Sequence, residues 1–260
     1  MKENTINGYL ITCITNMHVG SEGVNYGVVD NLVQRDTISN IPVINSSSLK
    51  GALREFFKDK WGENDIKLNY IFGPDDTRNE SEKGKSGIGH YNFFEAKLLS
   101  LPMRSNRKPY YNVTTKDLID NINSIYKSIS GKNELIVNPY ENKKVAKEVV
   151  KLEDWQTEAN LQLTENNIIG ENIATFDTDT FKKVVKSLPV IARNKLLNGE
   201  SKNLWYEEVV PRESRFVFCV SLTEKYKVEF EEELENAIVQ IGGNASIGYG
   251  FTKITKIKQL

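Results

Sequence analysis

The sequence predicts an α+β fold built on an antiparallel sheet, of the ferredoxin-like type. Three observations lead to this prediction. The N-terminal part reads as strand, loop, strand and helix. The C-terminal part reads as strand, strand, helix, glycine-rich turn and strand. Residues 103–200 lie between these parts and show weaker periodicity, which indicates insertions into a smaller core fold.

The N-terminal elements follow from the spacing of apolar side chains. The segment GYLITCITNMHVG, residues 8–20, alternates apolar and polar residues and predicts a strand. A glycine-bearing loop follows, and residues 41–45 predict a short strand. Residues 46–62 predict a helix, with three serines as its N-cap and Gly62 as its stop. Its apolar residues fall at helical spacing: Leu49, Leu53, Phe56 and Phe57.

The middle of the chain predicts shorter elements. Residues 74–90 are polar and contain glycines, which is typical of a loop. The segment FFEAKLLSLPM predicts a strand that ends at Pro102. Residues 116–129 and 177–188 predict two short helices.

The C-terminal part predicts a strand pair followed by a helix and a strand. LWYEEVVP and SRFVFCVSL, residues 204–211 and 214–222, are expected to pair across the turn between them. The segment FEEELENAIVQIG, residues 230–242, predicts an amphipathic helix that ends at a glycine. After the turn GGNASIGYG, residues 251–257 predict the last strand.

Composition bounds the class of protein. The 260 residues are 39% apolar and 27% charged, with a formal net charge of −1. These values exclude wholesale disorder and argue against a generic DNA-coating protein. No apolar run approaches about 18 residues, so we expect no membrane span and a cytoplasmic location. Cys13 and Cys219 lie in alternating apolar segments, which favours two buried free thiols over a disulfide or a metal site.

Charge is distributed unevenly along the chain. Residues 101–150 hold nine lysines and arginines against five acidic residues, whereas residues 224–235 contain six glutamates. Charged runs usually face water, so solvated surface is one interpretation of both stretches. A local basic groove is the other, and a net charge near zero does not exclude it.

Two segments have features of a phosphate-binding site. The turn GGNASIGYG has four glycines, which allow close approach of a phosphate to backbone N–H groups. The helix start SSSLKGALR places Ser46, Ser47 and Ser48 at a helix N-terminus, with Lys50 and Arg54 close behind. A tight structural turn and simple N-capping remain the alternatives, and no complete nucleotide-binding fingerprint is present.

Few residues are candidates for acid–base or metal chemistry. His18 lies at a strand end beside the glycine-bearing loop, and the only other histidine is His90. Asp30 lies on the same loop, where a carboxylate can bind a metal or act as a base, although most loop aspartates cap turns. Glu207 and Glu208 are adjacent on a predicted strand, so their side chains should point to opposite faces and share no metal.

An ordered set of motifs resembles the RAMP superfamily of CRISPR proteins. The set runs HVGS, GVVDNLVQRD, IPVI, SSLKGALR, IFGP, LPMRS, LWYEEVVP and IGGNASIGYGF. The GVVDNLVQRD loop, the LWYEE strand and the IGGN…GYG turn are similar to the repeated backbone subunit of the type III-B (Cmr) effector complex. The resemblance spans about residues 7–105 and 188–258 and covers 106–187 weakly.

The resemblance implies a fold and a domain organisation. Residues 1–260 would form a single RAMP domain with a ferredoxin-like (RRM-like) palm from about 1–105 and 188–260. Insertions over about 106–187 would include a thumb, which we expect within the basic residues 105–150. One departure is Asn45-Ser46, where the family usually has Pro-Gly, and this implies a changed turn geometry at the helix start.

The resemblance also implies a function. Several copies would bind a CRISPR RNA together with other Cmr subunits, and each copy would cleave complementary target RNA at regular intervals. The catalytic residue would be Asp30, acting with a divalent metal, Mg²⁺ or Mn²⁺, whose ligands stay unassigned. The residues on the RNA-binding side would be His18, Ser47, Ser48, Lys50, Arg54, Gly242, Gly243, Asn244, Gly248 and Gly250.

Four alternatives stay open at this point. The chain could be a non-catalytic RNA-binding backbone subunit, or a guide-RNA processing endoribonuclease of the same superfamily that relies on His18. It could be the sister backbone subunit of the type III-A (Csm) complex, although LWYEE argues against that interpretation. A small-molecule enzyme is the fourth, and no cofactor fingerprint supports it.

Overall fold

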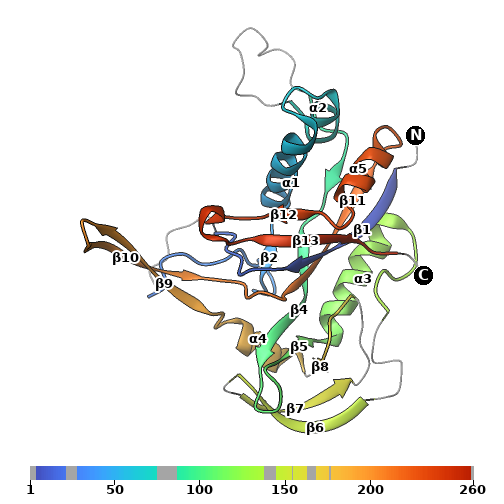
Figure 1. Ribbon diagram of the computed structural model, residues 1–260. Helices are drawn as coiled ribbons and strands as arrows, with labels where there is room; N and C mark the ends of the chain where they lie inside the picture. Colours follow the sequence, from blue (N-terminus) through green and yellow to red (C-terminus); the bar gives the residue numbers. More distant parts are fainter. Residues whose placement is uncertain are drawn as a thin grey trace.

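The computed structural model describes residues 4–21, 28–74, 87–137, 145–153, 155–162, 168–175 and 177–258 (Figure 1). The helical elements are α1 (Ser46–Trp61), α2 (Ile66–Phe72), α3 (Lys116–Ser130), α4 (Thr178–Val185), α5 (Lys227–Leu234) and the 3₁₀ turn η3 (Ala245–Ile247). The strands are β1 (Thr5–Cys13), β2 (Val43–Ile44), β3 (Asn92–Phe93), β4 (Ala96–Arg104), β5 (Tyr110–Thr114), β6 (Val145–Leu152), β7 (Trp155–Gln162), β8 (Ile173–Thr175), β9 (Val190–Leu197), β10 (Glu200–Glu208), β11 (Arg215–Leu222), β12 (Ile238–Gln240) and β13 (Phe251–Lys256).

Four strands form a ferredoxin-like core, which confirms the predicted fold class. They lie side by side in the order β13-β1-β11-β4, and every neighbouring pair is antiparallel. Helix α1 lies between β1 and β4 in the chain, and α5 lies between β11 and β13. This is the βαββαβ arrangement, with both helices in the places that the fold assigns to them.

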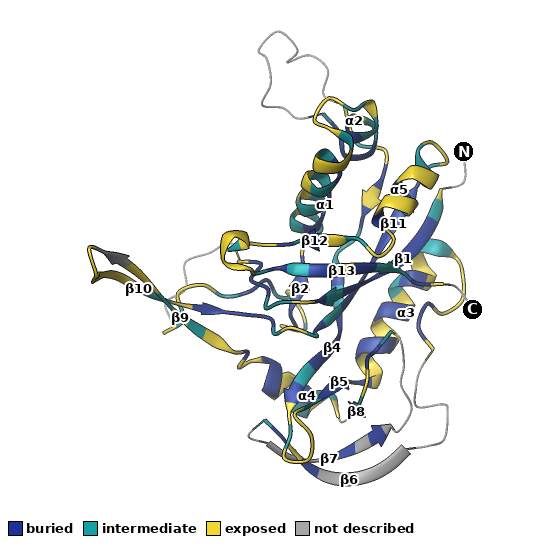
Figure 2. Cartoon of the chain, in the orientation of Figure 1, coloured by how far each residue is buried: buried dark blue, intermediate teal, exposed yellow. Residues whose placement is uncertain are grey.

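Both faces of this sheet are covered, and alternating residues serve the two faces. Tyr9 and Phe218 belong to the core shared with α1 and α5, whereas Leu10 and Val217 belong to a second cluster shared with α3. Figure 2 shows the central strands as buried along most of their length. Because both faces of the sheet are buried, residues that point to either face of these strands are mostly apolar.

Helix α1 begins one residue away from the expected cap. Asn45 is the N-cap residue, its side chain makes no cap hydrogen bond, and the serines lie inside the first turn. The prediction of a serine N-cap was therefore wrong, because the chain enters the helix directly from β2. The predicted stop is confirmed: Gly62 has φ +91° and donates its backbone N–H to Lys58 O.

The insertions lie between the second and third core strands. Strands β5, β8, β7 and β6 extend the sheet beyond β4, and β5 pairs with β8 in parallel. Strands β9 and β10 form a separate two-stranded hairpin that projects away from the sheet (Figure 1). This hairpin was expected in the palm, but it too lies between β4 and β11 in the chain.

Strands at 204–211 and 214–222 are present, yet the prediction that they pair was wrong. Strand β10 pairs with β9, whereas β11 pairs with β1 and β4. Asn198 and Gly199 link β9 to β10 with φ of +53° and +83°. An Asn-Gly pair with positive φ at both residues favours a tight two-residue hairpin, and this local signal decides the partner of β10.

Two element ends also differ from prediction. The predicted helix over 230–242 stops at Leu234, and residues 238–240 form β12 against β13. Asn236 lies between them with φ +59°, a conformation that ends the helix. Strand β4 continues past Pro102, which lies opposite Asn112 of β5. The Asn112 N–H donates to Asn172 O and not to β4, so Pro102 and Asn112 form a pair without mutual hydrogen bonds, and this pair needs no N–H from proline.

Other expectations concern single features. Cys13 and Cys219 are buried and free, as predicted. Of the polar loop at 74–90, residues 75–86 lie outside the described part of the chain. Among the helices that the structure describes, none is both long enough and apolar enough to cross a membrane.

Candidate functional site

Asp30 is fixed at the root of the hairpin and faces solvent. Its backbone N–H donates to Tyr206 O at 3.0 Å, and its Oδ2 accepts the backbone N–H of Tyr206 at 2.7 Å. The residue is exposed, and no described residue bonds to its Oδ1. One carboxylate oxygen therefore holds Asp30 against β10, while the other is open to a ligand.

Glu207 joins three segments of the chain beside Asp30. Its carboxylate accepts hydrogen bonds from Trp205 Nε1 at 2.9 Å, Arg193 Nε at 3.0 Å and Asn244 Nδ2 at 3.0 Å. Asn31 Nδ2 lies at 3.5 Å from it. The hairpin, the Asp30 loop and the glycine-rich turn thus converge on one carboxylate, and donors already occupy both of its oxygens.

The charge of Glu207 is stabilised by these partners. Burial raises the pKa of this carboxyl, but hydrogen bonds from Trp205 and Arg193 and the nearby His18 outweigh burial, so the pKa is lowered. Glu207 is therefore an ionised anchor at neutral pH. It is poorly suited to act as a general base or a metal ligand.

Glu208 points to the other side of β10, as the alternation predicts. Its Oε2 accepts the backbone N–H of Val33 at 3.1 Å, and its Oε1 pairs with Arg35. Arg35 Nη1 also donates to Val185 O at 2.9 Å, which ties this side of the hairpin root to α4. The two glutamates have separate sets of partners, which confirms that their side chains point to opposite faces.

His18 lies between the hairpin root and the glycine-rich turn. It is 8% exposed, and its Nδ1 lies 2.7 Å from Glu208 O. Because a carbonyl oxygen only accepts, Nδ1 must carry the hydrogen, and Nε2 is the nitrogen left for another partner. The backbone oxygen of His18 accepts the N–H of Gly243 at 2.9 Å.

The glycine-rich turn is built mainly by structural requirements. A Cβ on Gly242 would lie 2.3 Å from His18 O, and a Cβ on Gly250 would lie 2.1 Å from Ile241 O. The backbone N–H groups of Gly243, Gly248 and Gly250 already donate to His18, Ala245 and Asn16. These contacts favour the structural interpretation of the turn over a backbone phosphate cradle. Gly250 is also buried, whereas Gly242, Gly243 and Gly248 are exposed.

The start of α1 is joined to this region through Gln34, a residue that no pattern in the sequence singles out. Gln34 is 7% exposed, and its side chain donates to Ser48 Oγ at 2.9 Å and to Gly20 O at 3.2 Å. Its Oε1 accepts the backbone N–H of Asn45 at 2.8 Å. The predicted helix N-terminus and the His18 segment therefore belong to one surface.

The basic residues of α1 differ in their hydrogen-bond partners. Arg54 Nη1 donates to Gly73 O at 2.6 Å, so this side chain helps to hold the end of α2. Lys50 is partly exposed, and no hydrogen bond or ion pair joins its side chain to the described residues. Ser47 is exposed at the helix start, and Asn45 leaves the first turn without a side-chain cap. Lys50 and Ser47 are thus better placed than Arg54 to meet an anion.

The described residues contain no group of three or more His, Cys, Asp or Glu side chains that could hold a metal by themselves. The open oxygen of Asp30 still fits a Mg²⁺ ion, which usually keeps several waters and takes one or two carboxylates plus substrate phosphates. Glu207 is excluded as a second ligand by its donors.

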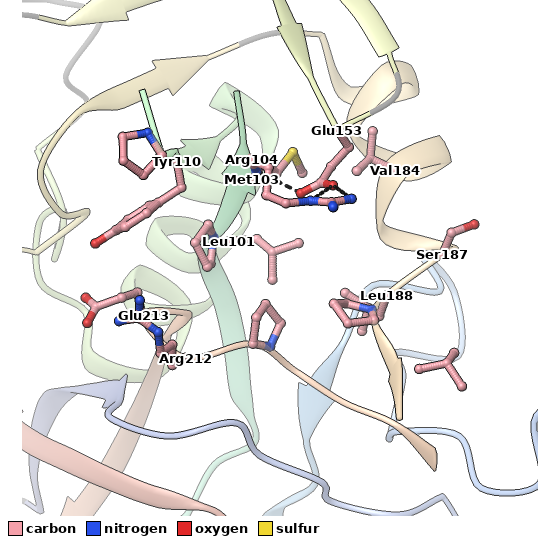
Figure 3. Close-up of a pocket in the computed structure, with 15 residues that line it drawn as sticks. Leu101, Met103, Arg104, Tyr110, Glu153, Val184, Ser187, Leu188, Arg212 and Glu213 are labelled. Carbon is pink, nitrogen blue, oxygen red and sulfur yellow. Dashed lines mark hydrogen bonds and ion pairs between the residues drawn. The ribbon is translucent and has the colours of Figure 1, made fainter. Parts of the chain in front are cut away.

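A cavity of about 580 Å³ opens at the root of the hairpin (Figure 3), and Asp30 is not one of the residues that line it. Its floor is apolar, with Leu101, Met103 and Leu188. Its rim carries the pair Arg104–Glu153, with Arg104 Nε donating to Glu153 Oε2 at 2.8 Å. Charges of both signs on the rim make it a poor match for a phosphodiester backbone.

The fold and this site define a class of ferredoxin-like proteins in which an insertion between the second and third core strands supplies a projecting hairpin. Its root meets a glycine-rich turn and an exposed aspartate. The chain belongs to the RAMP superfamily, whose family model matches residues 10–253.

Known proteins are similar to it over nearly its full length. The chain is 29% identical to "CRISPR system Cmr endoribonuclease Cmr4" of Pyrococcus furiosus, over 93% of this chain and 92% of that protein. Its fold resembles a chain of the type III-B Cmr-beta complex bound to cognate target RNA, with a TM-score of 0.77, 21% identity and 99% of both chains covered. It also resembles oligomeric Cmr4 from Pyrococcus furiosus, with a TM-score of 0.68, 22% identity and coverage of 98% and 99%.

Proposed function

We propose that this chain is the repeated backbone subunit of a cytoplasmic type III-B CRISPR effector complex. Copies of it bind a CRISPR RNA together with other Cmr subunits and cleave complementary target RNA at regular intervals. Family membership and the full-length similarity to a Cmr endoribonuclease support the assignment. The observation that carries the catalytic part is Asp30, an exposed carboxylate held at the hairpin root with one oxygen open.

RNA supplies its own nucleophile in this reaction. The 2′-oxygen of one nucleotide attacks the adjacent phosphorus, and the bond from phosphorus to the 5′-oxygen breaks. The products are a 2′,3′-cyclic phosphate and a 5′-hydroxyl, with the 2′-proton removed and the leaving oxygen protonated. The protein must hold the nucleotide in line and stabilise charge as it develops.

Asp30 would assist either by accepting the 2′-proton or by holding a divalent ion through water. The ion, Mg²⁺ or Mn²⁺, would stabilise charge on the phosphate oxygens when bound. Both roles need the open Oδ1. The Tyr206 N–H that fixes Oδ2 keeps the carboxylate at a constant place on the hairpin root.

The hairpin β9–β10 is our assignment for the thumb, in place of residues 105–150. It projects from the palm at the point where Asp30, His18 and the glycine-rich turn meet. Leu204 is 54% exposed and Tyr206 is 38% exposed on one face of it. Exposed apolar and aromatic side chains on a thumb can separate bases and splay out the nucleotide to be cut.

The guide-binding side would consist of the α1 start and the exposed part of the glycine-rich turn. Ser47 and Lys50 are available to phosphates at the helix N-terminus, where the helix dipole also favours an anion. His18 and Gly250 would act from within, by shaping the loop that the RNA meets, because both are largely buried.

Cleavage by reconstituted complexes tests the catalytic role of Asp30. Asp30→Asn keeps an oxygen that can accept the Tyr206 N–H but removes the charge, so a drop in activity would report chemistry and not folding. We expect at least about 100-fold slower cleavage of matched target RNA, in the range expected when acid–base catalysis is removed. A DNA target of the same sequence should survive in every case, because it lacks the 2′-hydroxyl.

Asp36→Asn is the matched control. Asp36 is a loop carboxylate held by its own turn and by Lys97, and its replacement should leave cleavage close to the unmodified rate. Full cleavage by the Asp30 variant would instead support a non-catalytic backbone subunit.

A further inference from the structure

Arg193 forms the outermost described contact between the hairpin and the palm. It lies on β9 opposite Trp205, and its side chain is 15% exposed. Its Nε donates to Glu207 Oε2 at 3.0 Å, and its guanidinium carbon lies 4.3 Å from the ring centre of Tyr249. Tyr249 belongs to the glycine-rich turn, so one side chain joins β9 both to Glu207 on β10 and to that turn.

The contacts of Arg193 do not resemble those of a residue that only fills space. Its Nη2 is buried and has no hydrogen-bond partner among the described residues. A buried donor without a partner is costly, and an apolar side chain would fill the same volume without that cost. What only a guanidinium supplies here is a charged donor to Glu207 together with a flat surface on Tyr249.

A short series of contacts leads from Arg193 to Asp30. Glu207 accepts from Arg193 on one oxygen and lies 3.5 Å from Asn31 Nδ2 on the other. The backbone of Asn31 makes two hydrogen bonds to β10: its N–H donates to Tyr206 O, and its oxygen accepts the N–H of Glu208. Asp30 precedes Asn31 and is fixed by Tyr206. A shift of β10 at Glu207 therefore moves the carboxylate of Asp30.

The other face of the hairpin root is held closer to the palm. Val190 lies on the opposite face of β9 from Arg193, by strand alternation, and it lines the cavity of about 580 Å³ (Figure 3). Glu208 also holds this face, because it pairs with Arg35 and accepts the Val33 N–H. Further out along the hairpin, Arg193 contacts Tyr249 from the other face.

We propose that Arg193 is a positioning residue for target cleavage, which holds the hairpin against Tyr249 and, through Glu207, keeps Asp30 in place. This inference rests on the proposed function. Arg193 needs no contact with RNA for this role. It predicts that removal of the Arg193 side chain slows the cleavage step while target RNA still binds.

The test compares three variants in the assembled complex. Arg193→Met removes the charge and the donor, whereas Arg193→Lys keeps a donor and a charge but lacks the planar group. Lys195→Met is the matched control, because Lys195 is exposed two residues further along the same face of β9. Target RNA affinity and the single-turnover cleavage rate at saturating complex are measured separately.

We expect Arg193→Met to lower the single-turnover rate at least about tenfold, since small misplacement of a reacting group is costly. Its affinity for target RNA should stay within about twofold, Arg193→Lys should recover part of the rate, and Lys195→Met should match the unmodified complex. Equal rates for Arg193→Met and the unmodified complex would overturn the proposal. So would an equal decrease for Arg193→Met and Lys195→Met.

A spectroscopic signature separates positioning from general damage. The indole N–H of Trp205 donates to Glu207, so its ¹H–¹⁵N resonance in the full chain reports on this carboxylate. The resonance, assigned with Trp205→Phe, should move in Arg193→Met and not in Lys195→Met. An unmoved resonance would contradict the proposed link. If the unmodified complex cleaves no target RNA, the proposed function fails, and this failure is distinct from that of the Arg193 inference.

Discussion

At the scale of single residues, two loop aspartates close in sequence have different surroundings. Asp30 is exposed and uses one oxygen for the Tyr206 N–H. Asp36 is held by the N–H groups of Ile38 and Ser39, the Ser39 hydroxyl and Lys97. The first has an oxygen to offer a ligand, while the second completes a turn. The residue type alone does not distinguish them.

The partners of Asp36 make stability depend on pH. Burial raises the pKa of its carboxyl, but the hydrogen bonds from Lys97 and the turn lower it well below its usual range. The stability from this shift is fully present above the unfolded-state pKa of about 3.9 and disappears as the pH falls further. Asp36→Asn should therefore show a shallower fall in unfolding free energy between about pH 5 and pH 2, measured by chemical denaturation.

Asp59→Asn is the control for this measurement, because Asp59 is exposed on α1. It should keep the pH dependence of the unmodified chain. Identical pH dependence in the Asp36 variant would show that the turn contributes no measurable linkage.

Lys50 is expected to contact a phosphate of the guide. Binding releases about one counterion for every phosphate that a basic side chain neutralises, so Lys50→Ala should reduce the salt slope of RNA binding by about 0.7–0.9. Filter binding at several salt concentrations measures this slope. Lys60→Ala, at the far end of α1, should leave it unchanged. An unaltered slope for Lys50→Ala would remove the helix start from the RNA-binding surface.

At the scale of elements, the aromatic residues of α1 fix the helix on the sheet. Phe57 is fully buried, stacks on Phe230 of α5 with ring centres 4.9 Å apart, and also contacts Phe72 of α2. One side chain thus connects three helices. All three rings belong to the larger of the two core clusters.

Removal of this ring should be severe for stability. Phe57→Ala is expected to lower the free energy of unfolding by about 3–5 kcal/mol, because apolar burial decreases and a cavity is left behind. Phe56→Ala, a neighbour that is only partly buried, should cost clearly less. Urea denaturation compares them, and a cost for Phe57→Ala no larger than that for Phe56→Ala would contradict the packing described.

Local sequence signals predicted most elements but not their partners. Helix α3 was predicted within a residue at each end, because a Thr115 cap and Gly131 in a left-handed conformation bound it. Strand β10 was predicted as a strand but paired with the wrong neighbour, although Asn198-Gly199 marks its true hairpin. Alternation of apolar residues identifies a strand and its faces, and it carries no information about which strand lies beside it.

The candidate site was predictable only in part, because the partners of some of its residues are distant in the chain. Asp30, His18 and the glycine-rich turn stand out in the sequence, and the structure brings them together at the hairpin root. Gln34, Arg193 and Tyr249 do not stand out. Their importance comes from partners that are distant in the chain, such as Gly20 for Gln34 and Glu207 for Arg193.

At the scale of the whole molecule, the charge is divided among surfaces that the net value of −1 conceals. The acidic stretch at 224–235 includes the exposed Glu229 and Glu233 of α5, on the same side of the sheet as α1. Helix α3 covers the opposite face and exposes Lys116 and Lys127 together with Asp117 and Asp120, so its charges balance. The negative charge is therefore concentrated at α5, and the lysines and arginines that balance it are distributed over other parts of the chain.

The order of the core strands has a consequence for synthesis. Strand β1 is made well before both of its neighbours, β11 and β13, because α1, β4 and the insertions lie between them in the chain. Tyr9 finds its cross-strand position only when Lys256 has emerged. The palm therefore cannot close before β13 has been made, and a product that stops before β11 would expose β1 on both edges. Such fragments lack the closed palm, so they are suited to degradation and not to assembly.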